Sequence, residues 1–132
     1  YVPLSPNTTM IALMQRLQLP AVLVTRPNLG TLNHTLLSIE ALKHHGITTR
    51  AVVVVESQRT NWGDIEENNL KTLHEWLDIP VLGPVRYMPG LSRNELSPET
   101  FKGKLQATTH KIIDLFVEAR AQHDRQQWLT FE

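Results

Sequence analysis

The feature that most constrains the fold is a set of short apolar runs that alternate with longer helical patterns. Two of these runs, Pro20–Thr25 and Thr49–Val55, lack the polar alternation of a half-exposed strand, and the second ends in four consecutive valines. Valine is disfavoured in helices, and a continuous apolar run is typical of a parallel strand that is covered on both faces. The sequence therefore predicts two buried strands, and we expect the Pro20–Thr25 strand to be central.

Segments with apolar residues three and four positions apart separate and flank these runs. This spacing predicts helices over Thr9–Leu19, Thr31–His45 and Asp64–Leu77. The apolar stripes of the first and third of these helices contain Met10, Leu13, Met14 and Leu17, and Ile65, Leu70, Leu73, Trp76 and Leu77. We expect Trp76 to belong to the core, and Gly46 to end the second helix as a C-cap.

Two further elements complete the pattern. Pro80–Val85 predicts a third strand, and its prolines favour a position at the edge of the sheet. A Ser97 cap followed by Pro98 predicts a last helix of roughly 20 residues or more. Strands that alternate with helices are typical of βαβ units, so the predicted fold class is α/β, with a mainly parallel sheet and flanking helices.

Composition excludes several classes of function. The 132 residues fit one compact domain, and 13 basic residues balance 13 acidic residues without any run of like charge. This balance argues against nucleic-acid or anionic-membrane partners, which bulk positive charge attracts. The absence of cysteine excludes disulfides, thiol nucleophiles and cysteine-bound metal clusters. The apolar runs are far shorter than the roughly 20 residues that span a bilayer, so we expect a soluble, cytoplasmic protein.

Several chemical motifs are also absent from the sequence. Neither G-x-x-x-x-G-K-[ST] nor G-x-G-x-x-G can be written on this chain, so it contains no phosphate-binding glycine loop. His44 and His45 are adjacent, and neighbours on a helix point about 100° apart, which disfavours a shared metal ion. Glu66 and Glu67 diverge for the same reason. We therefore assign no catalytic residue and no metal ligand to this chain.

The segment from residue 28 to residue 34, NLGTLNH, carries the strongest local signal for a ligand. A strand end, a tight turn and a helix N-terminus coincide there. Free backbone N–H groups at a helix N-terminus favour a carboxylate or phosphate, and ligands of open α/β sheets bind at the carboxyl ends of strands. The alternative explanation of the same residues is a capped helix whose polar side chains lie at the surface and bind no ligand. Glu56 directly follows a buried strand, and both a structural and a ligand-binding role are open for it.

Five strings of the sequence match a known family: LPAVLV at 19–24, LGTLNHTLL at 29–37, EAL at 40–42, ENNL at 67–70 and IPVLG at 79–83, of which LGTLNHTLL is the most specific. Over about residues 1–90 the chain resembles the C-terminal half of dethiobiotin synthetase. The resemblance implies a P-loop NTPase-like fold. In that family the phosphate loop lies in the N-terminal half, so we expect residues 1–132 to form a single domain or half-domain that lacks this half.

The function implied by the resemblance is an ATP-dependent ring closure in biotin biosynthesis. CO2 forms a carbamate on one amine of 7,8-diaminopelargonate, ATP phosphorylates this carbamate, and the second amine closes the ureido ring as phosphate leaves. The family is a homodimeric ATP-dependent cyclo-ligase that uses Mg2+. Because the phosphate loop and the metal-binding acids are missing here, we expect this chain to be inactive without them, and a second chain carrying the phosphate loop is a possible partner.

The resemblance also places candidate site residues. The family turn that binds the substrate's tail carboxylate across the dimer interface matches Gly30, Thr31, Leu32 and Asn33, with Asn69 as a further candidate on the next helix. The positions on the side of the nucleotide base are Val55, Glu56, Arg86, Tyr87 and Met88. The family usually has an Asn at the end of this strand. A glutamate lacks the paired donor and acceptor of an amide, so we expect base recognition to be altered or lost.

Two other hypotheses remain open on these residues. The first is a non-catalytic interaction or regulatory domain that retains the fold without the phosphate loop. The departures at Val55, Glu56, Pro84 and Arg86 favour it. The second is a related amidoligase or phosphotransacetylase-type domain with another small carboxylate substrate, and the Asn33-His34 pair argues against it.

Overall fold

A computed structural model describes residues 1–59, 61–90, 99, 110–111, 113–114 and 117. The chain divides into two compact units, Tyr1–Tyr87 and Met88–Glu132, and the elements below all belong to the first. The predicted helix after Ser97 lies almost entirely outside the described residues. In the described part of the chain, no helix has both the length and the apolar composition needed to cross a membrane.

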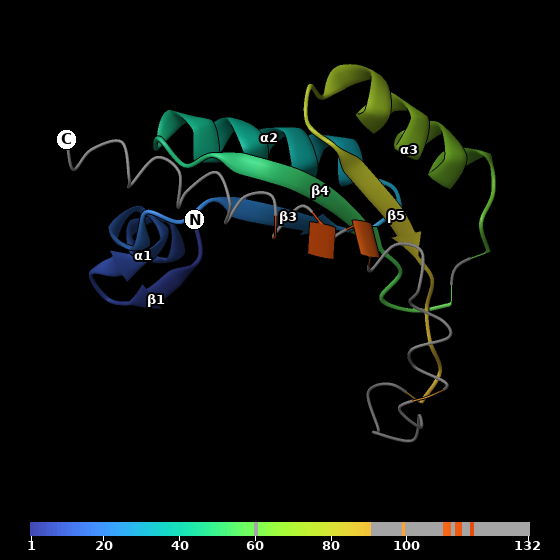
Figure 1. Ribbon diagram of the computed structural model, residues 1–132, viewed down its shortest axis with the longest axis horizontal. Helices are drawn as coiled ribbons and strands as arrows, with labels where there is room; N and C mark the ends of the chain where they lie inside the picture. The colour runs from blue at the N-terminus through green and yellow to red at the C-terminus, as the bar shows by residue number, and fades with distance from the viewer. Residues whose placement is uncertain (60, 91–98, 100–109, 112, 115–116, 118–132) are drawn as a thin grey trace. The chain divides into compact units, whose positions relative to one another are not determined.

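The first unit is an α/β structure in which strands and helices alternate (Figure 1). Its elements are, in chain order, β1 (Pro3–Ser5), β2 (Thr8–Thr9), α1 (Met10–Leu17), β3 (Ala21–Thr25), α2 (Thr31–His44), β4 (Thr49–Val55), α3 (Asp64–Trp76) and β5 (Val81–Val85). Strands β1 and β2 form a short antiparallel hairpin, and β3, β4 and β5 form a parallel sheet in that spatial order. Helices α2 and α3 lie on one face of this sheet (Figure 1). The predicted parallel sheet with flanking helices is confirmed.

The order of the strands corrects one prediction. In the sheet that the described residues form, β4 is central, whereas β3 lies at an edge and its Val24 is 62% exposed. A continuous apolar run indicates that the two faces of a strand are covered. It does not indicate how many neighbouring strands are hydrogen-bonded to that strand, and so it does not predict a central or an edge position. The prediction of coverage on both faces is confirmed for β4, because Ala51, Val52, Val53 and Val54 are all buried, and it is wrong for β3, where Val24 is exposed. Strand β5 lies at the other edge, as its prolines predict.

The core consists of two clusters beneath the helices. In the larger one, Val52 and Val54 of β4 pack with Leu73 of α3 and Val81 of β5. Trp76 is 69% exposed, so its predicted place in the core is wrong. Leu70 and Leu73 of α3 pack on this core together with Leu77, which directly follows the helix, whereas Trp76, the last residue of the helix, is not among the residues that pack there. The smaller cluster joins α1 to the sheet through Ile11, Ala21, Leu42 and Ile47.

Candidate functional site

The site is built around the turn between β3 and α2. Gly30 has a φ of +91°, a conformation that side-chain-bearing residues rarely adopt, and it stands at the N-cap of α2. The N–H of Thr31 donates to the carbonyl of Asn28 at 3.1 Å, and the N–H of His34 donates to the carbonyl of Gly30 at 3.1 Å. These bonds turn the chain from the end of the strand directly into the helix. No side chain caps the N-terminus of α2.

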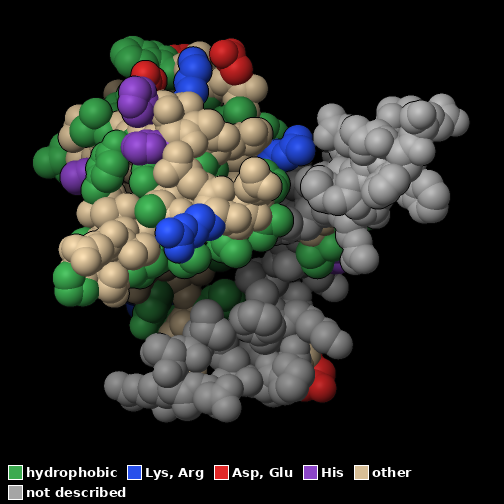
Figure 2. Space-filling model, turned by 90° about the vertical axis from the view of Figure 1, so that its left-hand side faces the viewer, with side chains coloured by type: hydrophobic (Ala, Val, Ile, Leu, Met, Phe, Trp, Pro, Cys, Tyr) green, Lys and Arg blue, Asp and Glu red, His purple; other side chains and the backbone are tan. Residues whose placement is uncertain are grey.

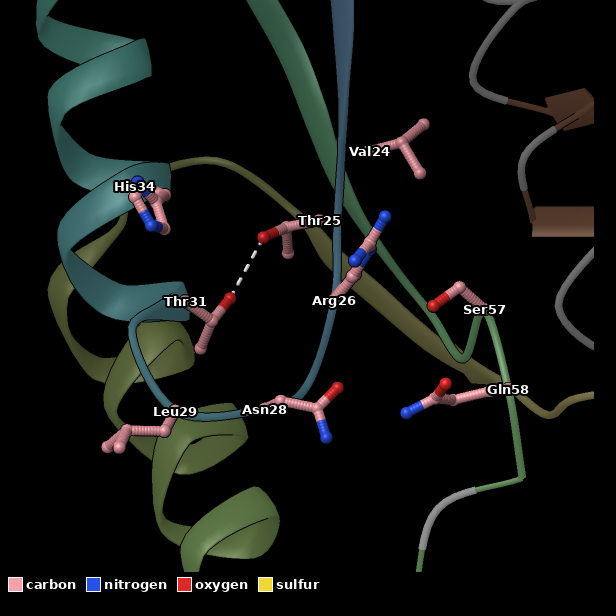
Figure 3. Close-up of a pocket in the computed structure, with 9 residues that line it drawn as sticks. All are labelled: Val24, Thr25, Arg26, Asn28, Leu29, Thr31, His34, Ser57 and Gln58. Carbon is pink, nitrogen blue, oxygen red and sulfur yellow. Dashed lines mark hydrogen bonds between the residues drawn. The ribbon is translucent and has the colours of Figure 1, made fainter.

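A pocket of about 620 Å³ opens beside this turn (Figure 3). It lies between the carboxyl ends of the neighbouring strands β3 and β4 and the first turn of α2, which is the location where open α/β sheets bind ligands. Its lining residues are Val24, Thr25, Arg26, Asn28, Leu29, Thr31, His34, Ser57 and Gln58. None of these residues is acidic, and Arg26 supplies a permanent positive charge, so the pocket favours an anionic group over a cationic one.

A chain of three threonine hydroxyls connects the pocket to the interior. The Thr35 hydroxyl donates to the Thr25 oxygen at 2.9 Å, and the Thr25 and Thr31 oxygens are 2.8 Å apart, as the dashed line in Figure 3 shows. Thr31 and Thr35 are buried. When Thr25 donates to Thr31, the proton of the Thr31 hydroxyl is free for an acceptor in the pocket. The three hydroxyls thereby attach the end of β3 to the first turn of α2.

Asn69 of α3 holds this turn from outside the pocket. Its Nδ2 donates to the carbonyl of Pro27 at 3.0 Å and to that of Asn28 at 3.4 Å. Asn69 does not line the pocket, but it contacts the backbone of Asn28, which does. Its predicted contact with substrate stays a prediction, and the geometry adds a second role, which is to fix the position of the turn.

The other residues of the predicted carboxylate-binding turn have different surroundings. Thr31 lines the pocket, and Gly30 forms the turn itself. Leu32 packs against the larger core cluster, whereas Asn33 is exposed outside the pocket lining. Backbone N–H groups, rather than the side chains of Leu32 and Asn33, are therefore the atoms that this turn offers to an anion.

Sequence reasoning missed four polar residues of the pocket, of which Thr25 is the last residue of β3. Arg26 follows the last residue of β3, and Ser57 and Gln58 follow Glu56 after the end of β4. The available signal was their place directly after two apolar runs, because the carboxyl ends of parallel strands meet at one edge of the sheet. The turn-forming residues after β3 point to Gly30, whereas the charge that lines the pocket belongs to Arg26, four positions before it.

Four of the residues predicted to face the nucleotide base are brought together at the ends of β4 and β5, namely Val55, Glu56, Arg86 and Tyr87. Glu56 is only 7% exposed. Its Oε1 accepts a hydrogen bond from Nη1 of Arg86 at 2.9 Å, and its Oε2 accepts one from the N–H of Tyr87 at 2.9 Å. Val55 pairs with Val85 in the sheet, and Met88 belongs to the second unit. Contact of these residues with a base stays a prediction.

The described residues do not fit a magnesium ion or the phosphates of ATP. Within them, no group of three or more His, Cys, Asp or Glu side chains could hold a metal ion. Both carboxylate oxygens of Glu56 already accept hydrogen bonds. The sequence also has no glycine loop that could surround a triphosphate. What the pocket of the described residues offers a ligand is one permanent positive charge, from Arg26, together with neutral hydrogen-bond donors.

Known proteins are similar to this chain over the region that contains the pocket. A family model described as an AAA domain, AAA_26, matches residues 1–95, a range that includes every residue lining the pocket. The chain is 37% identical over 90 residues to the ATP-dependent dethiobiotin synthetase BioD of Thermodesulfovibrio yellowstonii. The aligned region covers 68% of this chain and 38% of that protein. The chain is 35% identical over 89 residues to the proteins of the same name from Bacillus thuringiensis and Bacillus cereus, covering 67% of this chain and 36% of each relative.

The chain thus spans well under half the length of the curated relatives it matches. The family match nevertheless includes all the elements of the first unit, from β1 to β5. The chain therefore belongs to the AAA_26 family of AAA domains and is dethiobiotin synthetase-like over about two thirds of its length.

Proposed function

We propose that this chain forms the side of a dethiobiotin synthetase-like active site that binds the substrate carboxylate. The observation that carries the proposal is the pocket at the carboxyl ends of β3 and β4, which opens onto the turn at Gly30 and lies within the family-matched residues. The substrate proposed is 7,8-diaminopelargonate, which has a carboxylate at one end and two amines at the other.

The charges and donors of the pocket support binding of the carboxylate end. Arg26 provides a cation, and the N-terminus of α2 adds a positive partial charge and N–H groups that no side chain caps. The hydroxyl of Thr31 and the amide of Asn28 add neutral donors. The amines would meet no carboxylate among the residues that line the pocket, so they are expected to extend away from it.

The steps that need ATP require residues beyond those described. The relatives are called ATP-dependent, and we propose ATP with Mg2+ for the complete reaction on that ground. Carbamate phosphorylation needs a phosphate-binding loop, which this sequence lacks. We propose that a second polypeptide carrying the loop supplies it, and that two copies of this chain assemble so that the turn of each serves its partner's site.

Titration of the isotope-labelled chain with 7,8-diaminopelargonate, followed by NMR, tests the carboxylate site. We expect the backbone amide signals of Thr31, Leu32 and Asn33 to shift. Replacing Arg26 with Met removes a charge-assisted hydrogen bond and should raise Kd by about tenfold or more. Arg16→Met is the matched control, because Arg16 lies in the last turn of α1, outside the pocket.

A diamine without the carboxyl group separates the two ends of the substrate. It should bind far more weakly than 7,8-diaminopelargonate, and Arg26→Met should not weaken it further. Equal affinity of the wild-type chain for both compounds would show that the pocket does not recognise a carboxylate. The absence of any shift in the amides of the turn would contradict the proposed site itself.

A non-catalytic binding domain is the second candidate function. It is favoured by the engagement of both Glu56 oxygens at the position predicted to face the base. Phosphate release from Mg-ATP, measured with 7,8-diaminopelargonate and bicarbonate, separates the two functions when it is repeated with an added polypeptide that carries the phosphate loop. Release that requires both polypeptides supports the enzyme. Ligand binding without release in either mixture supports the binding domain.

A further inference from the structure

Arg86 contacts both ends of one loop. The loop that follows Glu56 after β4 begins with Ser57, Gln58 and Arg59, and Asn61 is its last residue before Trp62 and Gly63, which lead into α3. The Nη1 of Arg86 donates to Oε1 of Glu56 at 2.9 Å, just before the loop begins. The guanidinium carbon of Arg86 also lies 4.2 Å from the centre of the Trp62 ring, just after the loop ends. A single side chain at the end of β5 therefore fastens the loop at its beginning and at its end.

Both contacts of Arg86, the one with Glu56 and the one with Trp62, can fix the conformation of the loop. Glu56 is buried and receives a second hydrogen bond from the N–H of Tyr87, so its carboxylate is fixed by two donors from the segment after β5. The planar guanidinium of Arg86 suits simultaneous pairing with a carboxylate and stacking on an aromatic ring, which a lysine ammonium cannot reproduce. Glu56 would be left as an unpaired buried charge if Arg86 were removed.

The loop held in this way forms one wall of the pocket. Ser57 and Gln58 line the pocket on the side opposite Asn28, and their side chains point toward the space between the two strands in Figure 3. The Nε1 of Trp62 donates to Oε2 of Glu67 on α3 at 2.8 Å. Two residues further along α3, Asn69 holds the carbonyls of Pro27 and Asn28. One helix thus anchors both walls of the pocket.

We propose that Arg86 is a positioning residue that fixes the Ser57 and Gln58 wall for binding of an anionic ligand. Through Glu56 and Trp62 it holds the loop in a preorganised form, so ligand binding does not have to order the loop. The effect on the loop stands on the contacts of Arg86 alone, whereas the effect on ligand affinity rests on the proposed function.

Hydrogen exchange measured by mass spectrometry on the ligand-free chain tests the effect on the loop. Arg86→Met keeps the apolar stem and removes the charge and the planar group. We expect exchange in residues 57–62 to accelerate by about tenfold or more, since fastened loops open less often. Lys71→Met is the matched control, because it removes the cation of an exposed ion pair with Glu75 on α3 that does not touch the loop. It should leave this exchange unchanged.

Affinity for 7,8-diaminopelargonate, measured at a temperature where every variant is folded, tests the effect on the ligand. Arg86→Met should raise Kd by about tenfold, because two wall side chains must then be ordered on binding. Arg86→Lys should give an intermediate Kd, since it keeps the charge opposite Glu56 but loses the stacking on Trp62. A merely structural role would lower Tm and leave both Kd and the local exchange of the folded chain as in the wild type, and this result would overturn the proposal.

A second variant covers the case in which Arg86→Met does not fold. Trp62→Leu removes the stacking surface and the bond to Glu67 but leaves the buried carboxylate paired. It should accelerate exchange in the loop and raise Kd, by less than Arg86→Met in a folded chain. Unchanged exchange in Trp62→Leu would overturn the proposal. If the wild-type chain does not bind 7,8-diaminopelargonate although exchange responds as expected, the proposed function fails and the role of Arg86 in holding the loop stands.

Discussion

Helices α1 and α3 have similar apolar spacing in the sequence, yet they contribute differently to the core. Leu73 of α3 lies in its predicted stripe and is 1% exposed against the centre of the sheet. In α1 the predicted stripe remains largely at the surface, with Leu17 55% exposed, and the buried residue is Ile11, which lies outside that stripe. Figure 2, seen from the side on which α1 lies in Figure 1, shows hydrophobic side chains at the surface between polar atoms.

The difference follows from what each helix packs against. Helix α3 lies over β4 and β5, and it packs on the middle of β4, where Ala51, Val52, Val53 and Val54 are buried. Helix α1 follows a two-stranded hairpin and reaches the sheet only near the first residue of β3, through Ile11 and Ala21. Apolar periodicity therefore predicts that a helix forms, but the partner surface decides which of its residues are buried.

The largest effect is expected for Leu73→Ala. This substitution removes a fully buried side chain from the larger cluster and leaves a cavity, so it should lower the free energy of unfolding by about 3 kcal/mol. Urea unfolding followed by circular dichroism measures the change. Leu37→Ala on the exposed side of α2 is the matched control and should cost less than about 1 kcal/mol. Similar losses in the two variants would show that α3 does not pack as described.

An intermediate effect is expected for Ile11→Ala. Ile11 is 8% exposed and belongs to the smaller cluster, where partly buried Met14 can relax toward the space that is left. We expect a loss of about 2 kcal/mol, at the lower end of the range for such truncations. The same urea titration measures it. A loss equal to that of Leu73→Ala would remove the distinction between the two helices, because α1 would then be as fully part of the core.

The smallest effect is expected for Leu17→Gln. Leucine and glutamine have similar helix propensities, and more than half of this side chain is already in contact with solvent, so stability should change by less than about 0.5 kcal/mol. Thermal unfolding by calorimetry measures this change. A clear loss of stability would show that the exposed stripe of α1 is covered in solution, and light scattering at several protein concentrations would then identify self-association as the cause.

The candidate site shows where prediction from sequence succeeds. The letters NLGT at residues 28–31 combine turn-forming residues with the start of an apolar helical pattern, and the structure has a positive φ at Gly30 and a pocket beside it. A left-handed turn between a strand and a helix is a local property, because it depends on a few neighbouring residues. The same holds for the N-cap at Thr9, whose Oγ1 accepts a hydrogen bond from the N–H of Ala12 at 3.3 Å.

Contacts between distant segments could not be predicted in this way. Glu56 and Arg86 are 30 positions apart, and they meet because Val55 and Val85 pair in neighbouring strands, so that the next residues leave the sheet side by side. The register of two strands depends on the packing of both, and a shift of one residue would turn these side chains to opposite faces. The two pocket walls likewise come from segments about 30 positions apart, which follow the paired strands β3 and β4 and are both held by α3.

The sequence by itself determined helices α1 to α3, the three strands of the parallel sheet, the α/β class and the turn that precedes α2, because helix periodicity, β-branched runs and glycine conformation act over short distances. Only the tertiary structure decided that β4 and not β3 is central in the described sheet, that Trp76 is exposed, and that Arg86 fastens the loop beside the pocket. Each of these depends on which surfaces of distant segments meet, and burial is a property of the assembled core rather than of any single segment.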